Sequence, residues 1–129
     1  MQILLVGKRS SITITVQTML RSIDDWSAQL YSDLDNLDKL NEENANFDLL
    51  IVNLGDFSTA SIKAVSQIHE QFPDTPLLVI HSYINKAFIK PILKAGALGY
   101  IYDDISEKKL VEAVRKVAQG TECIIAEST

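Results

Sequence analysis

Cysteine is almost absent from this sequence, and so are long hydrophobic runs. The one cysteine among 129 residues, Cys123, cannot form an intramolecular disulfide, which fits the reducing cytoplasm as the expected location. No apolar run approaches the roughly 20 residues that a membrane-spanning helix needs. The short apolar run at residues 3–6 is followed, not preceded, by Lys8 and Arg9, so it lacks the pattern of a signal peptide. We therefore expect no membrane partner.

Positive charge is also scarce. The sequence has 12 Lys and Arg residues against 17 Asp and Glu residues, which gives a net charge of −5. Contacts with nucleic-acid phosphates need clustered Lys and Arg, so this segment is not expected to bind nucleic acid non-specifically. Its 129 residues are enough for one domain whose hydrophobic core needs no disulfide or structural metal.

What the sequence does contain is a regular alternation of short apolar runs with helical patterns, which is typical of an α/β domain. Residues 3–6, 49–52 and 77–80 are continuously apolar, as expected for parallel strands covered by helices on both faces. Residues 28–31 and 100–102 are mixed in polarity, so we place them at the edges of the sheet. Right-handed crossovers then predict a doubly wound parallel sheet of five strands in the order 2-1-3-4-5.

Four of the connecting helices are predicted from apolar residues at helical spacing and from polar residues that could cap them. The first follows Ser10 or Ser11, the second begins near Ser32, the third follows residues 58–59, and the last follows Ser106 and ends at Gly120. Their core-facing residues are Ile12, Val16, Met19, Leu20 and Ile23; Leu34, Leu37 and Leu40; Ile62, Val65 and Ile68; and Leu110, Val114 and Val117.

Pro91 interrupts the remaining helical segment, residues 85–95. A proline in a helix interior removes a hydrogen bond and clashes with the preceding turn, at a cost of about 3 kcal/mol. We therefore expect a kinked helix or one that begins at Lys90. The alternative is that the residues before Pro91 form a loop.

The most specific motif lies at residues 94–101, which read Lys-Ala-Gly-Ala-Leu-Gly-Tyr-Ile. Together with the apolar strand at residues 3–6 and with Asn53 at the end of the third strand, this motif resembles the receiver domain of bacterial response regulators. The resemblance implies the flavodoxin-like fold, an open α/β sheet whose functional residues gather at the carboxyl ends of the strands.

Two further segments, residues 76–80 and 114–120, are similar to the corresponding parts of LuxR-type transcription regulators. The resemblance implies a receiver-like domain at residues 1–120. Residues 121–129 would then be a C-terminal tail or the start of a linker.

The resemblance also implies a phosphorylation pocket, which this sequence does not preserve. A working receiver holds Mg²⁺ with two acids after the first strand and with the phosphoacceptor aspartate after the third. A Ser or Thr after the fourth strand and a Lys after the fifth contact the phosphoryl oxygens. All five matching positions depart from this pattern: Gly7, Lys8, Asn53, His81 and Asp103. We therefore expect no metal, no cofactor and no enzymatic activity, because the amide of Asn53 has no anionic oxygen to attack phosphorus.

The charges of this pocket have changed places. Lys8 stands where the family has an acid, and Asp103 stands where the family has a lysine. With neutral residues at positions 7 and 53, the pocket carries no net charge. A direct Lys8–Asp103 ion pair would stand in for the metal and the phosphoryl group, and the alternative is that both side chains are solvated.

Other residues near the pocket have two interpretations. Ser82 could reach the pocket in place of His81 if the fourth strand ends one residue later. Asp56 could be a substitute phosphoacceptor, although a solvated loop carboxylate is favoured. His81 could titrate near neutral pH as a sensor, although a neutral polar residue is favoured. Tyr100 matches the aromatic switch residue of the family and is expected to hold one rotamer, and His69 is expected at the surface.

These expectations favour a regulatory domain over an enzyme or a phosphorelay protein. The first hypothesis is a pseudo-receiver that signals without phosphorylation as the N-terminal part of a LuxR-type regulator, with DNA bound by a C-terminal domain outside this sequence. The alternative is a stand-alone adaptor that binds a protein through its fourth helix, fifth strand and fifth helix. Self-association is expected through that same face or through the first and fifth helices.

Overall fold

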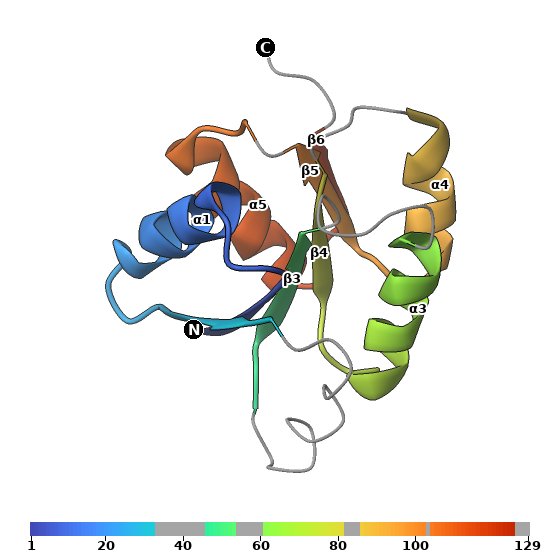
Figure 1. Cartoon of the computed structure of the whole chain (residues 1–129), viewed down its shortest axis with the longest axis horizontal. Helices are drawn as coiled ribbons and strands as arrows, with labels where there is room; N and C mark the ends of the chain where they lie inside the picture. Colours follow the sequence, from blue (N-terminus) through green and yellow to red (C-terminus); the bar gives the residue numbers. More distant parts are fainter. Residues whose placement is uncertain (33–45, 54–60, 82–85, 103, 126–129) are drawn as a thin grey trace.

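The computed structural model describes residues 1–32, 46–53, 61–81, 86–102 and 104–125 (Figure 1). The predicted second helix, the loop containing Asp56, and the positions of Ser82 and Asp103 lie outside these residues. No helix in the described ranges is long and apolar enough to cross a membrane.

Six parallel strands form one sheet in the order β2-β1-β3-β4-β5-β6. The strands are β1 (Gln2–Val6), β2 (Ser27–Tyr31), β3 (Leu49–Asn53), β4 (Leu77–His81), β5 (Gly99–Tyr102) and β6 (Cys123–Ile125). This result confirms the flavodoxin-like α/β prediction and the order 2-1-3-4-5, and it adds a sixth strand. The continuous apolar runs of β1, β3 and β4 are buried, as expected for strands covered on both faces.

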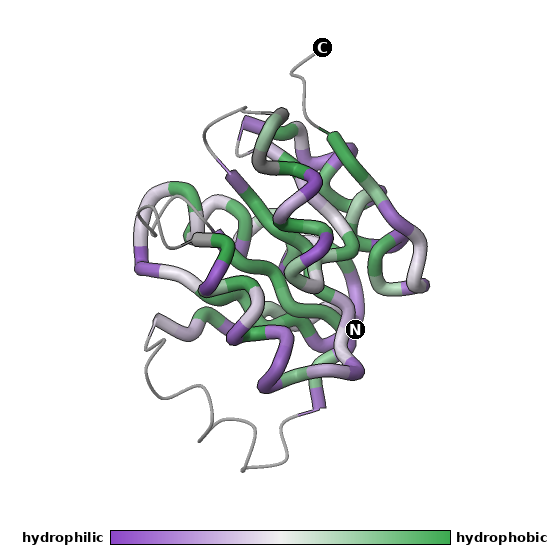
Figure 2. Tube along the Cα trace, turned by 90° about the vertical axis from the view of Figure 1, so that its right-hand side faces the viewer, coloured by the Kyte–Doolittle hydropathy of each residue, from purple (hydrophilic) through white to green (hydrophobic). Residues whose placement is uncertain are grey.

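The described helices cover the two faces of the sheet in pairs. Helices α1 (Ser11–Arg21) and α5 (Glu107–Ala118) lie on one side, and α3 (Ser61–Gln71) and α4 (Lys86–Lys94) lie on the other (Figure 1). Each layer has its own buried cluster, and the hydrophobic strands run through the interior between them (Figure 2). The buried residues of α5 include Leu110, Val114 and Val117, which confirms the predicted apolar stripe.

Serine caps begin both helices of the α1–α5 layer. Ser10 is the N-cap of α1 in a capping box: its Oγ accepts from the Thr13 backbone N–H at 3.3 Å, and its own N–H donates to Thr13 Oγ1 at 2.9 Å. The Ser106 Oγ accepts from the Lys109 N–H at 3.2 Å and caps α5. Gly120 follows α5 with φ +87°, a left-handed conformation typical of glycine at a helix end.

Helix α4 differs from the expectation in its first residues. It spans Lys86–Lys94 with Pro91 inside it, so the predictions that it begins at Lys90, or that a loop precedes Pro91, are wrong. The first four N–H groups of any helix lack a partner within it. Pro91 is the sixth residue, just beyond these positions, so it costs the helix one hydrogen bond near its start. Ile92 is buried in the α3–α4 layer, and Ile89 and Leu93 pack against the same cluster. Burial of this apolar face offsets the hydrogen bond that proline cannot make.

Strand β5 was expected at an edge of the sheet, and this prediction is wrong. All four residues of β5 are buried, because β6 pairs with it on the side away from β4. The residues that form β6 were expected in the tail, where three residues are too few for a recognisable strand pattern. The edge position of β2 is confirmed: Ser27 and Gln29 are exposed, Ala28 is buried, and the last two residues are half-buried.

Candidate functional site

The carboxyl ends of β1, β3 and β4 bring four of the five predicted pocket residues to one edge of the sheet. Gly7 and Lys8 follow β1, Asn53 ends β3, and His81 ends β4. Gly7 and Asn53 are buried, His81 is half-buried, and Lys8 is exposed. The parallel register aligns these strand ends, since Val6 pairs with Val52 and Asn53 pairs with Ile80.

The backbone after β1 is fixed from two sides. The Gly7 N–H donates to the carbonyl of Tyr31, at the end of β2, at 3.1 Å. The Lys8 carbonyl accepts from the Thr13 Oγ1 hydroxyl of α1 at 2.7 Å. These two bonds hold the turn from the sheet into α1, so residues 7 and 8 have a defined position at the mouth of the pocket.

Asn53 is the last residue of β3, the position to which the resemblance assigns the phosphoacceptor. Its side chain is only 2% exposed, and it is one of two buried polar residues among those described. A neutral amide can be buried there once its hydrogen bonds are made, whereas an ionised carboxylate would need a cation beside it. The structure therefore places a neutral polar side chain, which cannot act as an anionic nucleophile, at the carboxyl end of β3.

Tyr100 lies inside the domain next to His81. The two ring centroids are 6.1 Å apart, with the ring planes tilted by 36°. Tyr100 is 1% exposed in the cluster between the sheet and the α3–α4 layer. Burial raises the pKa of the Tyr100 phenol above its usual value, so the ring stays neutral at physiological pH.

His69 was expected at the surface, but the structure places it half-buried against the turn before β5. A Cβ added to Gly96 would lie only 2.4 Å from His69 Cγ, so the imidazole packs directly on the glycine. The His69 Nδ1 atom is buried and has no hydrogen-bond partner among the described residues. Sequence reasoning missed this contact because His69 and Gly96 lie on different elements and share no local pattern.

The described residues offer no carboxylate cluster at the pocket. Within them, no group of three or more His, Cys, Asp or Glu side chains is placed to hold a metal ion. Gly7, Lys8, Asn53 and His81 supply no carboxylate oxygen, which is the ligand that Mg²⁺ prefers. These four positions therefore supply none of the carboxylate ligands that the resemblance would require.

The expected Lys8–Asp103 pair can be tested by charge reversal. If the two side chains interact, Lys8→Asp and Asp103→Lys should each lower the melting temperature more than the double variant, because each single change puts like charges together. The expected coupling free energy is small, about 0–1 kcal/mol, because Lys8 is exposed. Thermal melts of the four proteins measure it, and strictly additive effects would show that the two side chains do not interact.

In sequence, this chain is similar to bacterial regulatory proteins. No protein-family model matches the chain. The chain is 36% identical over 74 residues to the oxygen regulatory protein NreC of Staphylococcus epidermidis, which covers 57% of this chain and 34% of NreC. It is 28% identical over 78 residues to the transcriptional regulatory protein DegU of Brevibacillus brevis, which covers 60% of this chain and 33% of DegU. The chain thus spans about a third of the length of these curated relatives.

Solved structures of response regulators have the same fold as this chain. A LuxR family DNA-binding response regulator from Silicibacter pomeroyi superposes with a TM-score of 0.80 over 100% of both chains, at 15% identity. A response regulator from Thermotoga maritima superposes with a TM-score of 0.76 at 27% identity, over 92% of this chain and 98% of the other. The chain therefore has the flavodoxin-like fold of response-regulator receiver domains, and its relatives and structural neighbours are receiver domains of the LuxR and NarL family.

Proposed function

We propose that this chain is a phosphorylation-independent pseudo-receiver, the regulatory N-terminal part of a LuxR-type DNA-binding response regulator. The observation that carries the proposal is the buried amide of Asn53 at the phosphoacceptor position. Lys8 supports it, because a lysine at a metal-binding acid position repels a divalent cation. DNA would be bound by a further C-terminal domain, as the DNA-binding neighbour from Silicibacter pomeroyi suggests.

A phosphodonor assay tests this proposal directly. The protein is incubated with acetyl phosphate and Mg²⁺, and its intact mass is measured. We expect an unchanged mass. A stable adduct of one phosphoryl group on the folded protein would overturn the proposal.

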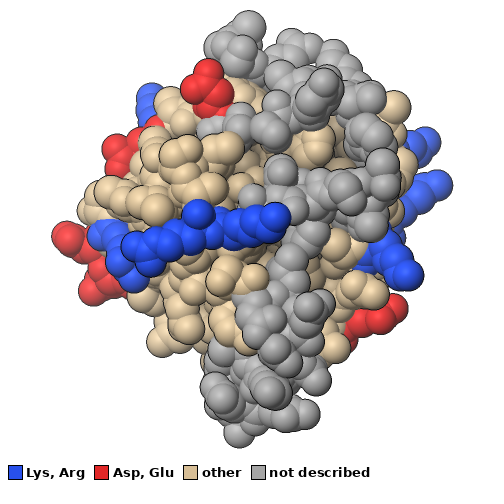
Figure 3. Space-filling view, in the orientation of Figure 1, with Lys and Arg blue, Asp and Glu red and all other residues tan. Residues whose placement is uncertain are grey.

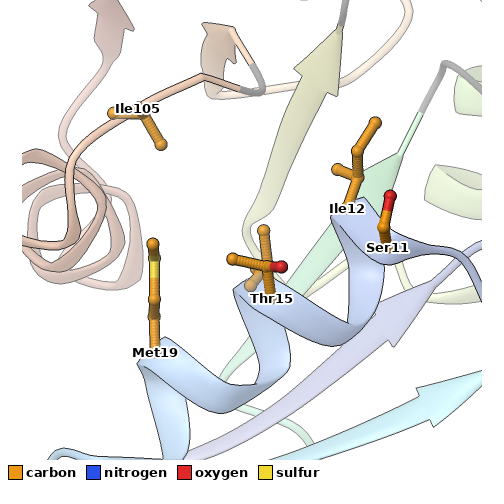
Figure 4. Close-up of a pocket in the computed structure, with 6 residues that line it drawn as sticks. Ser11, Ile12, Thr15, Met19 and Ile105 are labelled. Carbon is orange, nitrogen blue, oxygen red and sulfur yellow. The ribbon is translucent and has the colours of Figure 1, made fainter.

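We further propose that the domain associates with a second copy through the α1–α5 face. The first ten residues of α1 carry no charge, and Ile14 on this helix is 40% exposed. A groove of about 150 Å³ lies beside them, where Ile105, from the segment before α5, faces Met19 (Figure 4). The Ser22 hydroxyl donates to Glu107 Oε1 at 2.6 Å and joins the end of α1 to the start of α5.

The charges of α5 would give this contact its salt dependence. Lys108, Lys116 and Glu112 are exposed on the helix, so charges of both signs lie beside the first ten, uncharged residues of α1. Figure 3 shows Lys and Arg side chains next to Asp and Glu side chains on one face of the molecule. A second copy related by a two-fold axis would bring such mixed charges together in pairs.

Sedimentation at several protein concentrations and two salt levels measures this association. We expect a weak dimer that dissociates as salt rises, because salt screens exposed charge pairs. Ile14→Glu should abolish the dimer by placing a charge in the apolar contact. Ile124→Glu changes the other large hydrophobic exposed among the described residues, lies outside the α1–α5 face, and should leave the dimer unchanged. A monomer under all conditions, or equal effects of the two variants, would contradict this interface.

A further inference from the structure

Strand β6 is a short segment attached to the edge of an otherwise complete receiver sheet. It contains three residues and pairs only with β5, in the register Gly99–Cys123, Tyr100–Ile124 and Ile101–Ile125. The backbone bond from the Cys123 N–H to the Leu98 carbonyl, at 3.2 Å, fixes the start of this pairing. Figure 1 shows β6 beside β5 at the end of the described chain.

The connection from α5 to β6 is a short bend held on the end of α5: the Gly120 N–H donates to the Val117 carbonyl and the Thr121 N–H donates to the Lys116 carbonyl, each at 2.9 Å, so movement of β6 would begin after Thr121. Residues 120–122 are exposed, and Gly120 has φ +87° with no atom within 4 Å of the position where a Cβ would lie. A glycine in open space can change its backbone angles without a steric cost. Because Cys123 shares a buried cluster with Val114 and Val117 of α5, release of β6 would uncover a small part of that helix face.

Two inward side chains hold β6 in place. Cys123 is buried in the cluster between the sheet and the α1–α5 layer, and Ile125 is half-buried against the same cluster. Ile124 points the other way and is 42% exposed. By contrast, every residue of β5 is buried. A short edge strand held by two buried side chains is among the parts of a fold that open most easily. The neighbouring strand β5 belongs to the stable core.

We propose that β6 is a releasable strap over the edge of β5, and that its release allows two copies of this chain to pair through their uncovered β5 edges. The seated β6 shows that this edge accepts a parallel strand. Once uncovered, β5 presents unpaired N–H and C=O groups on an apolar strand, Gly-Tyr-Ile-Tyr, which is a template for strand pairing. Two identical edges can meet antiparallel about a two-fold axis.

The position of β6 would also decide whether the domain can self-associate through the β5 edge in addition to the α1–α5 face. While β6 is paired with β5, the β5 edge is covered and the α1–α5 face stays accessible. Release of β6 uncovers the strand that carries Tyr100, whose backbone partner in the seated state is Ile124. The proposal does not depend on the state of the pocket, so it can fail or succeed independently of the pseudo-receiver assignment.

The single cysteine provides a built-in reporter for strap release. Burial raises the pKa of the Cys123 thiol, with smaller opposing effects of Lys116, which lowers it, and Glu112, which raises it. The seated thiol is therefore both shielded and protonated, and it should react with a maleimide only when β6 leaves the sheet. We expect Cys123 in the native protein to react at least ~100-fold more slowly than in the urea-unfolded chain, and yet faster than global unfolding allows.

Two isoleucine variants distinguish local release of β6 from global unfolding of the domain. Ile125→Ser removes an inward anchor and should raise the labelling rate of Cys123 by about tenfold, because it loses partly buried apolar area. Ile124→Ser makes the same chemical change on the outward side and should alter the rate by less than about twofold. Labelling that follows the global unfolding rate in the wild type and both variants would overturn the strap.

The consequence of release is tested on the labelled protein. A maleimide adduct on Cys123 prevents β6 from reseating, so sedimentation of the labelled protein measures what the uncovered β5 edge does. We expect dimers, and we expect them also in the Ile14→Glu background, in which the α1–α5 contact is removed. Labelled protein that stays folded by circular dichroism and monomeric at every concentration would overturn pairing through β5.

Discussion

Replacement of Gly96 by alanine is expected to destabilise the domain by about 3 kcal/mol, through backbone strain and a steric clash together. Gly96 has φ +126°, a conformation that L-residues with a side chain rarely adopt. The added Cβ would lie 2.4 Å from His69 Cγ and 2.7 Å from His69 Cδ2. The imidazole is wedged between α3 and the turn, so relief requires α3 or the turn to shift. Urea unfolding followed by circular dichroism measures the loss.

Two further variants divide this effect into its causes. Gly120→Ala places a methyl group at φ +87° with no atom within 4 Å, so it should show the backbone strain alone, about 1 kcal/mol. In the His69→Ala background the contacts with Cγ and Cδ2 are gone, but the Cβ of residue 69 still lies 2.8 Å from the added methyl group, so Gly96→Ala should cost less than in the wild type and more than Gly120→Ala. Equal costs for Gly96→Ala and Gly120→Ala would contradict the close contact between His69 and Gly96.

Acetyl phosphate and Mg²⁺ are expected to leave the wild-type protein unmodified, and this is the largest difference that the proposed function predicts from a working receiver. Three deficits act together: Asn53 cannot form an acyl phosphate, Gly7 provides no ligand, and Lys8 repels the metal. Because each deficit alone removes a requirement of the reaction, no single reversion should restore phosphorylation. Asn53→Asp alone should therefore stay unmodified.

A rebuilt pocket provides the matched positive control. The variant combines Gly7→Asp, Lys8→Asp, Asn53→Asp, His81→Thr and Asp103→Lys, which returns all five positions to the pattern of a working receiver. We expect this variant to bind Mg²⁺ in a titration and to gain the mass of one phosphoryl group. Circular dichroism of both proteins establishes that each is folded. A phosphoryl adduct on the wild type would contradict the loss of function.

Local patterns in the sequence predicted much of the fold. Continuous apolar runs predicted the buried strands β1, β3 and β4, and the confirmed order of the first five strands followed from crossover handedness. The Ser10 and Ser106 caps were recognisable because capping depends on residues within one turn of the helix. The interior position of β5 could not be predicted, because the polarity pattern of a strand does not reveal whether another strand pairs with its edge.

The sequence likewise predicted some residues of the candidate site and gave no signal for others. The resemblance to receiver domains implied Gly7, Lys8, Asn53 and His81 as pocket residues, and the structure places all four at the carboxyl ends of adjacent strands. The role of Asp103 stays a prediction, since this residue lies outside the described ranges. The contact between His69 and Gly96 had no signal in the sequence, because a polar residue on a helix is usually exposed.

The sequence by itself determined which residue types stand at the predicted pocket positions. The residue type at each pocket position is a local fact, and an amide or a lysine cannot serve as a carboxylate in any fold. The tertiary structure decided which surfaces are open. The covered edge of β5, the seat of β6 and the packing of His69 on Gly96 all depend on segments that are distant along the chain. Such contacts are set by competition among all the elements for the same buried space, which no local pattern records.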